Sequence, residues 1–282
     1  MHFFVRAAAF VFTVMFFLSG ELCSEVHGNE TQRGVLVLTF DDGPRREVLM
    51  GPNGLLALLS REQIHAAFFV QGWQAHKNPD LVREIIHEGH LVANHTYGHA
   101  TPHEWARILA RKDKKDWKTL KDGAKSAYME KGKEVFLADA ERGRKTIESI
   151  VGYFPLFMRP PKWDIDQNIY CRLPSRYIVQ MIPGIVDDGV CPKDIQPRQD
   201  VNTGDYEVIK RYVKGTLSRD AAIHMLGVQW RKLLMDREAR GLHTHILVFH
   251  EHAIVADALR ILIPEWKKRR IHFASLTEVY GL

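Results

Sequence analysis

The alternation of short apolar runs with helix-forming stretches constrains the fold of this chain more than any other feature. Predicted strands and helices take turns through the first part of the chain, at residues 34–40, 54–60, 66–71, 79–88 and 90–95. Parallel strands joined by helices form one sheet with right-handed crossovers. Further apolar strands follow at 156–158, 177–182, 185–186, 245–249 and 271–274. The pattern predicts an α/β fold, a closed or distorted (β/α) barrel of about seven to eight strands.

The first 24 residues have the layout of a secretory signal peptide. Arg6 precedes an apolar run at 7–18, and small residues follow that run. The run is short for a membrane span, which needs about 20 residues. We therefore expect residues 1–24 to be cleaved, leaving a folded domain at 33–282 with no stable membrane span. This domain would be secreted or reside in the periplasm or cell envelope, and an uncleaved membrane anchor is the alternative.

Charge patterning excludes one class of partner and leaves another open. The formal net charge is +5 and the isoelectric point is about 9.0. No sequence module typical of nucleic-acid binding accompanies the basic residues, so we expect no nucleic-acid partner, whereas an anionic matrix or envelope polymer fits. Residues 103–133 form a basic helical insertion with ten Lys or Arg and five Asp or Glu. This insertion is either a solvated helical cover or a lobe that binds substrate or a partner.

Carboxylates and histidines follow two of the predicted strands, at the end where α/β folds bind ligands. Asp41 and Asp42 follow the first strand, and adjacent carboxylates repel unless a cation or hydrogen bonds offset their charges. His95 and His99 follow the third strand, and they present both imidazoles to one side if the intervening turn is helical. One carboxylate and two histidines leave a divalent cation with open positions, the arrangement used in metal-assisted hydrolysis.

Two cysteines remain after the predicted leader. Cys171 and Cys191 are separated by a short loop that closes without difficulty, and an exported protein meets an oxidising environment. We therefore hypothesise a disulfide between them, with two free thiols as the alternative.

Five segments, in order, resemble the motifs of the polysaccharide deacetylases, the NodB-homology or carbohydrate esterase family four. The first two are Thr-Phe-Asp-Asp-Gly-Pro at 39–44 and His-Thr-Tyr-Gly-His at 95–99. The others are Arg-Pro-Pro-Lys-Trp at 159–163, Asp-Val-Asn-Thr-Gly-Asp-Tyr at 200–206 and Leu-Val-Phe-His at 247–250. The resemblance covers the chain after the leader, and it implies a distorted barrel of the NodB-homology type.

The resemblance implies a metal site and a general base. Asp42, His95 and His99 would bind a divalent cation, usually zinc in this family. Asp41 would accept a proton from the attacking water, and Arg159 would hold Asp41 ionised through charge-assisted hydrogen bonds. The two adjacent aspartates therefore receive different roles.

The resemblance also implies a general acid and the walls of a groove. His250 would protonate the leaving amine, and Asp205 would orient His250 and raise its pKa. Asp187 and Asp188 compete with Asp205 for the place of the fourth motif. The backbone N–H of Lys162 would stabilise the developing oxyanion. Four substrate-binding positions depart from the family's usual tyrosine, glycine, tryptophan and leucine: Lys162, Trp163, Tyr206 and Val248.

The motifs and the leader together predict a secreted, metal-dependent N-deacetylase that releases acetate from glycans of the N-acetylglucosamine type. The basic charge and the leader favour peptidoglycan, and chitin-like or biofilm polymers also fit. One alternative is an O-acetyl esterase of the acetylxylan type, which uses the same metal and base but releases an alcohol. Another is a glycan-binding module that keeps the fold without catalysis. The oligomeric state is left open.

Overall fold

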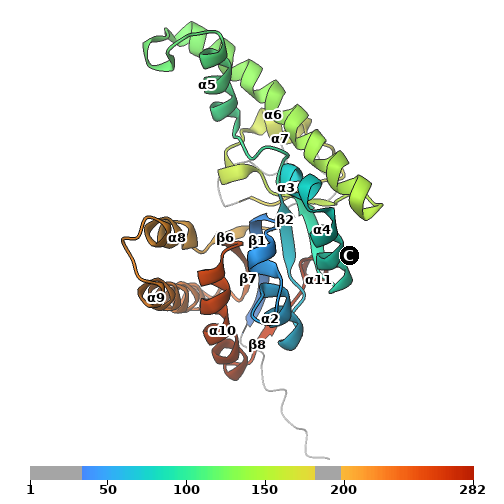
Figure 1. Ribbon diagram of the computed structural model, residues 1–282, viewed down its shortest axis with the longest axis vertical. Helices are drawn as coiled ribbons and strands as arrows, with labels where there is room; N and C mark the ends of the chain where they lie inside the picture. Colours follow the sequence, from blue (N-terminus) through green and yellow to red (C-terminus); the bar gives the residue numbers. More distant parts are fainter. Residues whose placement is uncertain (1–33, 182–197) are drawn as a thin grey trace, which may run out of the picture. The chain divides into compact units, whose positions relative to one another are not determined.

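A parallel sheet of eight strands lies at the centre of the protein (Figure 1). The computed structural model describes residues 34–181 and 198–282. The strands are β1 (Gly34–Gly43), β2 (Ala67–Val70), β3 (Leu91–Asn94), β4 (Phe157–Met158), β5 (Ile178–Val179), β6 (Asp200–Asn202), β7 (Thr244–His250) and β8 (Ile271–Phe273). Their spatial order is β5-β4-β3-β2-β1-β7-β6, and β8 pairs with the start of β1. Every pairing is parallel, as the alternating pattern predicts.

Apolar side chains on both faces hold β1 in the middle of the sheet, between β2 and β7. Leu38 and Phe40 pack into one core cluster, and Val37 packs into another. The ring of Phe40 stacks with that of Phe68 at a centroid distance of 5.2 Å and with that of Phe249 at 5.7 Å. Burial on both faces is typical of parallel strands and explains why β1 reads as a continuous apolar run.

The two ends of the strand order meet at a single point. Met181, just after β5, forms an isolated parallel bridge with Gln199, just before β6. The backbone N–H of Asp200 donates to the carbonyl oxygen of Met181 at 2.8 Å. The sheet is therefore curled, and the predicted distorted barrel of seven to eight strands is confirmed.

Helices follow most of the strands and supply the second layer of the core. In the described chain they are α1 (Arg46–Leu49), α2 (Leu55–Arg61), α3 (Gly72–Lys77), α4 (Pro79–His87), α5 (Pro102–Lys112), α6 (Asp122–Val151), α7 (Gln167–Arg172), α8 (Asp205–Val213), α9 (Arg219–Glu238), α10 (Ala253–Lys268) and α11 (Leu276–Tyr280), with the 3-10 turns η1 (Trp117–Thr119) and η2 (Pro161–Trp163). Trp230 of α9 and Trp266 of α10 are among the largest fully buried side chains, and both pack in the core cluster that contains Phe40.

Helix α5, turn η1 and the first half of α6 form a helical hairpin from residues 103–133, which we call the hairpin. A capping box fixes its start, because Thr101 and Glu104 each bond the other's backbone N–H. Helix α6 passes so close to α5 at Gly132 that a Cβ there would collide with the carbonyl of Pro102. In Figure 1 the hairpin extends away from the sheet. That these residues are an insertion stays a prediction.

The structure differs from the predicted elements at several places. Helix α6 is 30 residues long and begins well before the predicted start of 134–151, because its first turns pack against α5. Strand β6 and helices α1, α3 and α7 lie in stretches where no element was predicted. The remaining strands and helices of the described chain agree with the predictions to within a few residues.

Some predictions fall outside the described residues. These are the leader at 1–24, the strand at 185–186, and the candidate residues Asp187, Asp188 and Cys191. Cys171 is disulfide-bonded, and its pairing with Cys191 stays a prediction.

Helix α6 supports a loop after β3 through Gly143, which allows a first stability prediction. A Cβ at Gly143 would lie 2.6 Å from Oδ1 of Asn94 and 2.6 Å from the carbonyl carbon of Thr96. We expect Gly143→Ala to lower the free energy of unfolding by about 1–3 kcal/mol, because the backbone must shift. Gly123→Ala on the same helix meets no atom within 4 Å and should be neutral or slightly stabilising. Urea unfolding of both variants tests this, and equal stabilities would contradict it.

Candidate active site

The candidate active site is a cleft of about 430 Å³ at the carboxyl ends of β1, β3 and β7. Its lining residues come from segments far apart in the sequence: Asp41, Asp42, His95, His99, Arg159, Pro160, Lys162, Trp163, Asn202, Tyr206 and His250. They meet because parallel strands end at the same edge of the sheet. All the predicted site residues line this cleft except Asp205, which lies behind His250, and Val248.

The end of β1, where the register with β2 shifts between Asp41 and Gly43, aims the two adjacent aspartates at different partners. Asp42 has a left-handed backbone with φ of 71°, whereas Asp41 is still paired within the strand. The side-chain N–H groups of Gln71 and Gln74 hold Asp42 in place, donating to its Oδ1 at 2.8 Å and to its carbonyl oxygen at 2.9 Å. Gln71 was not among the predicted site residues, and no local pattern marks it.

His95 is a buried imidazole with a fixed orientation. Its Nδ1 lies 2.7 Å from the carbonyl oxygen of Arg159, so Nδ1 carries the proton and donates to that oxygen. The lone pair of Nε2 therefore points toward the cleft, where Nε2 lies 3.6 Å from Oδ1 of Asp42. Fixing the tautomer through the second ring nitrogen is the usual way a protein orients a metal-binding histidine.

The turn between the two histidines is not helical. Thr96 and His99 both have left-handed backbones, with φ of 62° and 59°, so the loop reverses sharply. This loop still brings Nε2 of His99 to 3.1 Å from Oδ1 of Asp42. The backbone N–H groups of Tyr97 and Gly98 donate to Oδ2 of Asp139 on α6, at 3.2 Å and 2.9 Å. Asp139 thus shapes the loop from a remote helix, and sequence analysis missed it.

Asp42, His95 and His99 form a donor set that fits a divalent metal ion. One ligand atom from each residue lies within 4.8 Å of the other two. Burial and the neighbouring imidazole of His95 lower the pKa of His99 to about 4, so the His99 imidazole is neutral, the form that binds a metal. One carboxylate and two imidazoles also match the ligand types that zinc takes at sites with an open position.

A buried arginine links Asp41 to a partner that sequence analysis missed. Nη1 of Arg159 donates to Oδ1 of Asp41 at 2.6 Å. Its Nε and Nη2 donate to the two carboxylate oxygens of Asp200 at 2.7 Å and 2.8 Å. The guanidinium also lies over the ring of Phe69 at 3.9 Å. Asp200 stands in the fourth motif segment, but its role depends on a side chain 41 residues away.

His250 is held by Asp205 through two hydrogen bonds. Asp205 accepts from the backbone N–H of His250 at 2.6 Å, and it lies 2.8 Å from Nδ1. Burial lowers the pKa of His250, but the hydrogen bond and charge of Asp205 outweigh burial and raise this pKa to about 9. His250 is therefore protonated at neutral pH. The rivals Asp187 and Asp188 lie outside the described residues, and Asp205 has the geometry predicted for the fourth motif.

Of the four predicted substrate-binding residues, three line the cleft and one is buried behind it. Lys162 and Trp163 line the cleft from η2, and Tyr206 lines it from α8. The ring of Tyr206 lies 5.5 Å from that of His250. Val248 does not line the cleft, since it is buried within β7, and its carbonyl oxygen accepts from Oγ1 of Thr203 at 2.5 Å.

Glu251 is a third buried carboxyl, after Asp139 and Asp200, that sequence analysis missed. Its Oε1 accepts from the backbone N–H of Arg45, and its own backbone N–H donates to the carbonyl oxygen of Asp41 at 2.9 Å. The side chain fills the space beside Gly43, where a Cβ would collide with it. Burial raises the pKa of Glu251 to about 8. Glu251 therefore supports the turn after β1 as a largely neutral acid at pH 7.

A protein-family model matches about half of the chain. The model described as polysaccharide deacetylase matches residues 28–174. A peptidoglycan-N-acetylglucosamine deacetylase of Bacillus cereus is 31% identical over 133 residues, which are 47% of this chain and 38% of that protein. A chitin deacetylase of Colletotrichum lindemuthianum is 43% identical over 74 residues, which are 24% of this chain and 28% of that protein. The chain thus spans less than half the length of both curated relatives.

Solved structures show the same fold. The crystal structure of a polysaccharide deacetylase from Bacillus cereus superposes with a TM-score of 0.60 and 20% sequence identity. The match covers 88% of this chain and 94% of that one. At this level of identity the likeness concerns the fold.

The contact between Asp205 and His250 gives a prediction that requires no substrate. Asp205→Asn keeps a hydrogen-bond acceptor but removes the negative charge, so that only the charges of Asp41 and Asp42 still oppose the effect of burial on the pKa of His250. Because hydrogen bonds to charged groups contribute about 1.5–3 kcal/mol, the pKa of His250 should fall by about one to two units. NMR titration of the imidazole measures this. Glu207→Gln, an exposed acid on the same helix, is the control, and an equal shift in both variants would contradict the assignment.

Proposed function

Because the chain belongs to the polysaccharide deacetylase family, we propose that it is a secreted, metal-dependent hydrolase that removes N-acetyl groups from glycans of the N-acetylglucosamine type and releases acetate. The observation that carries this proposal is one cleft that combines an arginine-bound carboxylate, a protonated histidine and a metal-binding donor set. Peptidoglycan is the favoured glycan, because relatives of the chain are named as peptidoglycan deacetylases.

Asp42, His95 and His99 would hold the divalent cation, which we infer to be zinc from the donor set. When bound, such a cation acts as a Lewis acid that polarises a carbonyl group and acidifies water. His95 keeps its proton on Nδ1 through the carbonyl of Arg159. Its Nε2 is therefore the atom offered to the metal.

Asp41 is the proposed general base. Arg159 donates to Oδ1 of Asp41, which orients the carboxylate and leaves Oδ2 to accept the proton of the attacking water. Asp200 in turn balances the guanidinium with a bidentate pair. The base is thus oriented by a group that cannot itself lose a proton at the pH of the reaction.

His250 is the proposed general acid. An amide needs a proton at its leaving nitrogen, because an amine anion is a very poor leaving group. Asp205 bonds Nδ1 of His250, so the proton to be donated sits on Nε2, and His250 lines the cleft. A histidine held cationic at neutral pH supports N-deacetylation over the release of an alcohol, which needs less assistance. The backbone N–H of Lys162 is the proposed donor to the developing oxyanion.

Export of the enzyme is part of the proposal. It is supported by the layout of residues 1–24, which lie outside the described residues. Among the described helices, none combines the length and the apolar character that crossing a bilayer requires.

Replacing the proposed base tests the mechanism. Asp41→Asn keeps the size of the side chain and an oxygen that accepts from Arg159, but it cannot take a proton at neutral pH. We expect kcat to fall by about 10²- to 10⁴-fold, the usual contribution of a general base, while bound zinc stays at the wild-type level. Acetate release from chitin hexamers and atomic absorption measure the two quantities. Turnover at the wild-type rate in this variant would rule out Asp41 as the base.

Replacing one of the metal-binding side chains tests the metal site separately. His95→Ala should lose both bound zinc and acetate release, and adding zinc back should not restore either at stoichiometric concentration. The wild type treated with a chelator should lose activity and regain it on addition of zinc. His76→Ala, a histidine on α3 that does not line the cleft, is the control and should keep both metal and activity. Activity of the wild type that persists in chelator would refute metal dependence.

A further inference from the structure

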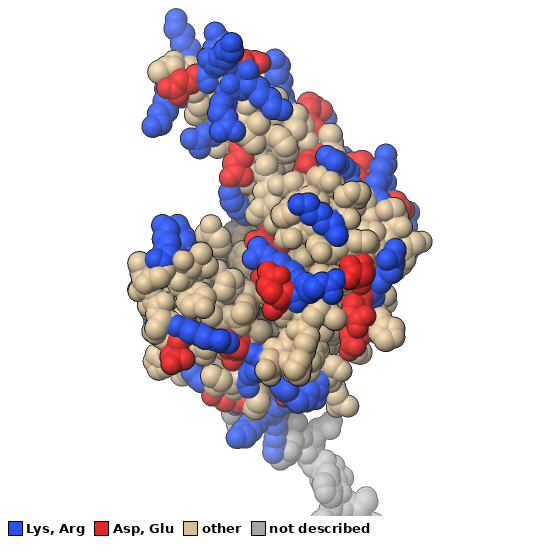
Figure 2. Space-filling view, in the orientation of Figure 1, with Lys and Arg blue, Asp and Glu red and all other residues tan. Residues whose placement is uncertain are grey.

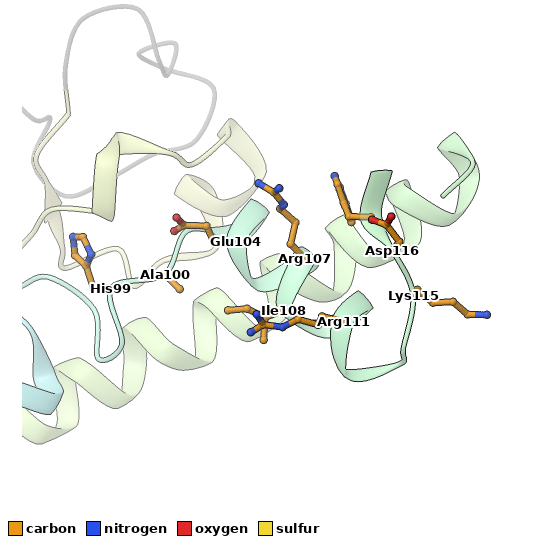
Figure 3. Close-up of a pocket in the computed structure, with 9 residues that line it drawn as sticks. His99, Ala100, Glu104, Arg107, Ile108, Arg111, Lys115 and Asp116 are labelled. Atoms are coloured by element: carbon orange, nitrogen blue, oxygen red, sulfur yellow. The ribbon is translucent and has the colours of Figure 1, made fainter. Parts of the chain in front are cut away.

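A second hollow adjoins the candidate active site and runs along the hairpin. Its volume is about 670 Å³, within the range of about 300–1,000 Å³ that is typical of ligand sites. His99 lines both this hollow and the cleft. We call the hollow the hairpin pocket and define it by Glu104, Arg107, Ile108, Arg111 and Asp116 (Figure 3), together with Trp117.

Two arginines dominate the charge of the hairpin pocket. Arg107 and Arg111 stand four residues apart on α5, so they lie one helical turn from each other on the same face. Both side chains are exposed, and neither forms an ion pair with a carboxylate in the part of the chain that the structure describes. Figure 2 shows that Lys and Arg gather on the hairpin. Lys115 lines the same pocket and adds a third positive charge.

The two carboxylates of the hairpin pocket are already engaged. Glu104 forms an ion pair with Lys162, which lines the neighbouring cleft, and it also caps α5. Asp116 accepts the backbone N–H of Lys118 at 3.0 Å and so caps η1. Positive charge is therefore in excess along the pocket, and the two arginines have no partner among the described carboxylates.

The wall of the hairpin pocket also offers apolar surface. Ile108 and Trp117 are half-buried. The indole of Trp117 stands edge-on to the ring of His103, at a centroid distance of 5.4 Å and an angle of 89°. An aromatic face beside guanidinium groups suits a ligand with an apolar face and an anionic substituent.

Resting on the proposed deacetylase function, we propose that the hairpin pocket is a distal subsite that binds carboxylate groups of the same glycan chain whose acetamido group occupies the cleft. Arginine recognises carboxylates with two parallel hydrogen bonds, which lysine cannot do. A separate protein or a membrane surface would not require a hollow that shares His99 with the cleft. The favoured substrate class is therefore an N-acetylated glycan that carries carboxylates.

A matched pair of substrates tests this proposal on the zinc-loaded full-length enzyme. Carboxymethyl chitin and glycol chitin share the N-acetylglucosamine backbone, but only the first carries carboxylates. The variant Arg107→Gln/Arg111→Gln removes two charges from the hairpin pocket. Lys112→Gln/Lys118→Gln removes two exposed charges from the same hairpin outside the pocket. Calorimetric binding of carboxymethyl chitin oligomers is measured alongside acetate release.

We expect the arginine variant to lose about tenfold in kcat/KM on carboxymethyl chitin through a higher KM, since two exposed ion pairs are removed. Affinity for the charged oligomers should fall by the same factor, and turnover of glycol chitin should stay unchanged. The lysine variant should stay within about twofold of the wild type on both substrates. Raising the salt concentration should weaken the wild type's preference for the charged polymer, because exposed ion pairs are screened.

Three results would overturn the subsite. They are an unchanged arginine variant, an equal loss in both double variants, and a loss of binding to phosphatidylglycerol vesicles without any loss on carboxymethyl chitin. The last result would assign the arginines to a membrane surface. Failure of the wild type to release acetate from glycol chitin would instead contradict the proposed function, and the calorimetric comparison of the two double variants would still decide the subsite.

Discussion

The buried guanidinium of Arg159 is the interaction on which the rest of the site depends. A buried cation is costly unless it is paired and hydrogen-bonded. Arg159 meets this condition with two bonds to Asp200, one to Asp41 and the ring of Phe69 beneath it. These partners belong to β6, β1 and β2, so the charge is satisfied only when the sheet has curled. The contacts of Arg159 that require a curled sheet therefore also orient the proposed base, Asp41.

The loop after β3, which carries the candidate metal donors His95 and His99, depends on a helix far from it in the sequence. Thr96 and His99 adopt left-handed backbones, and strained conformations of this kind cost about 1–3 kcal/mol each. Asp139 on α6 offsets this cost by accepting two backbone N–H groups of the loop, and Gly143 lets the helix approach closely enough to do so. The first half of the same helix, α6, forms one arm of the hairpin. One element thus supports the metal donors and carries the basic pocket beside them.

Sequence analysis located most of the strands and the candidate metal donors because long apolar runs and adjacent motifs are local signals. It missed β6, since Asp200–Asn202 is short and mostly polar. It missed the role of Asp200, because the partner of Asp200 is a remote arginine. Glu251 was missed for the same reason, as the space it fills is left by Gly43 on another strand. The turn between the histidines is not helical, and a remote residue, Asp139, holds that loop through its backbone N–H groups.

The charges around the cleft link the proposed metal site to the protonation of His250. Four carboxylates and two cationic side chains surround it: Asp41, Asp42, Asp200, Asp205, Arg159 and His250. The formal charges of these six groups sum to −2. Lys162, which also lines the cleft, is paired with Glu104 and adds no net charge. Glu251, with a pKa raised by burial to about 8, is largely neutral at pH 7. A divalent cation bound by Asp42, His95 and His99 would balance this charge. The balance holds only while His250 is protonated. Loss of that proton would leave one negative charge uncompensated in a partly buried site, which is costly. The electrostatics of the cleft therefore favour the state in which the metal and the general acid are both in place.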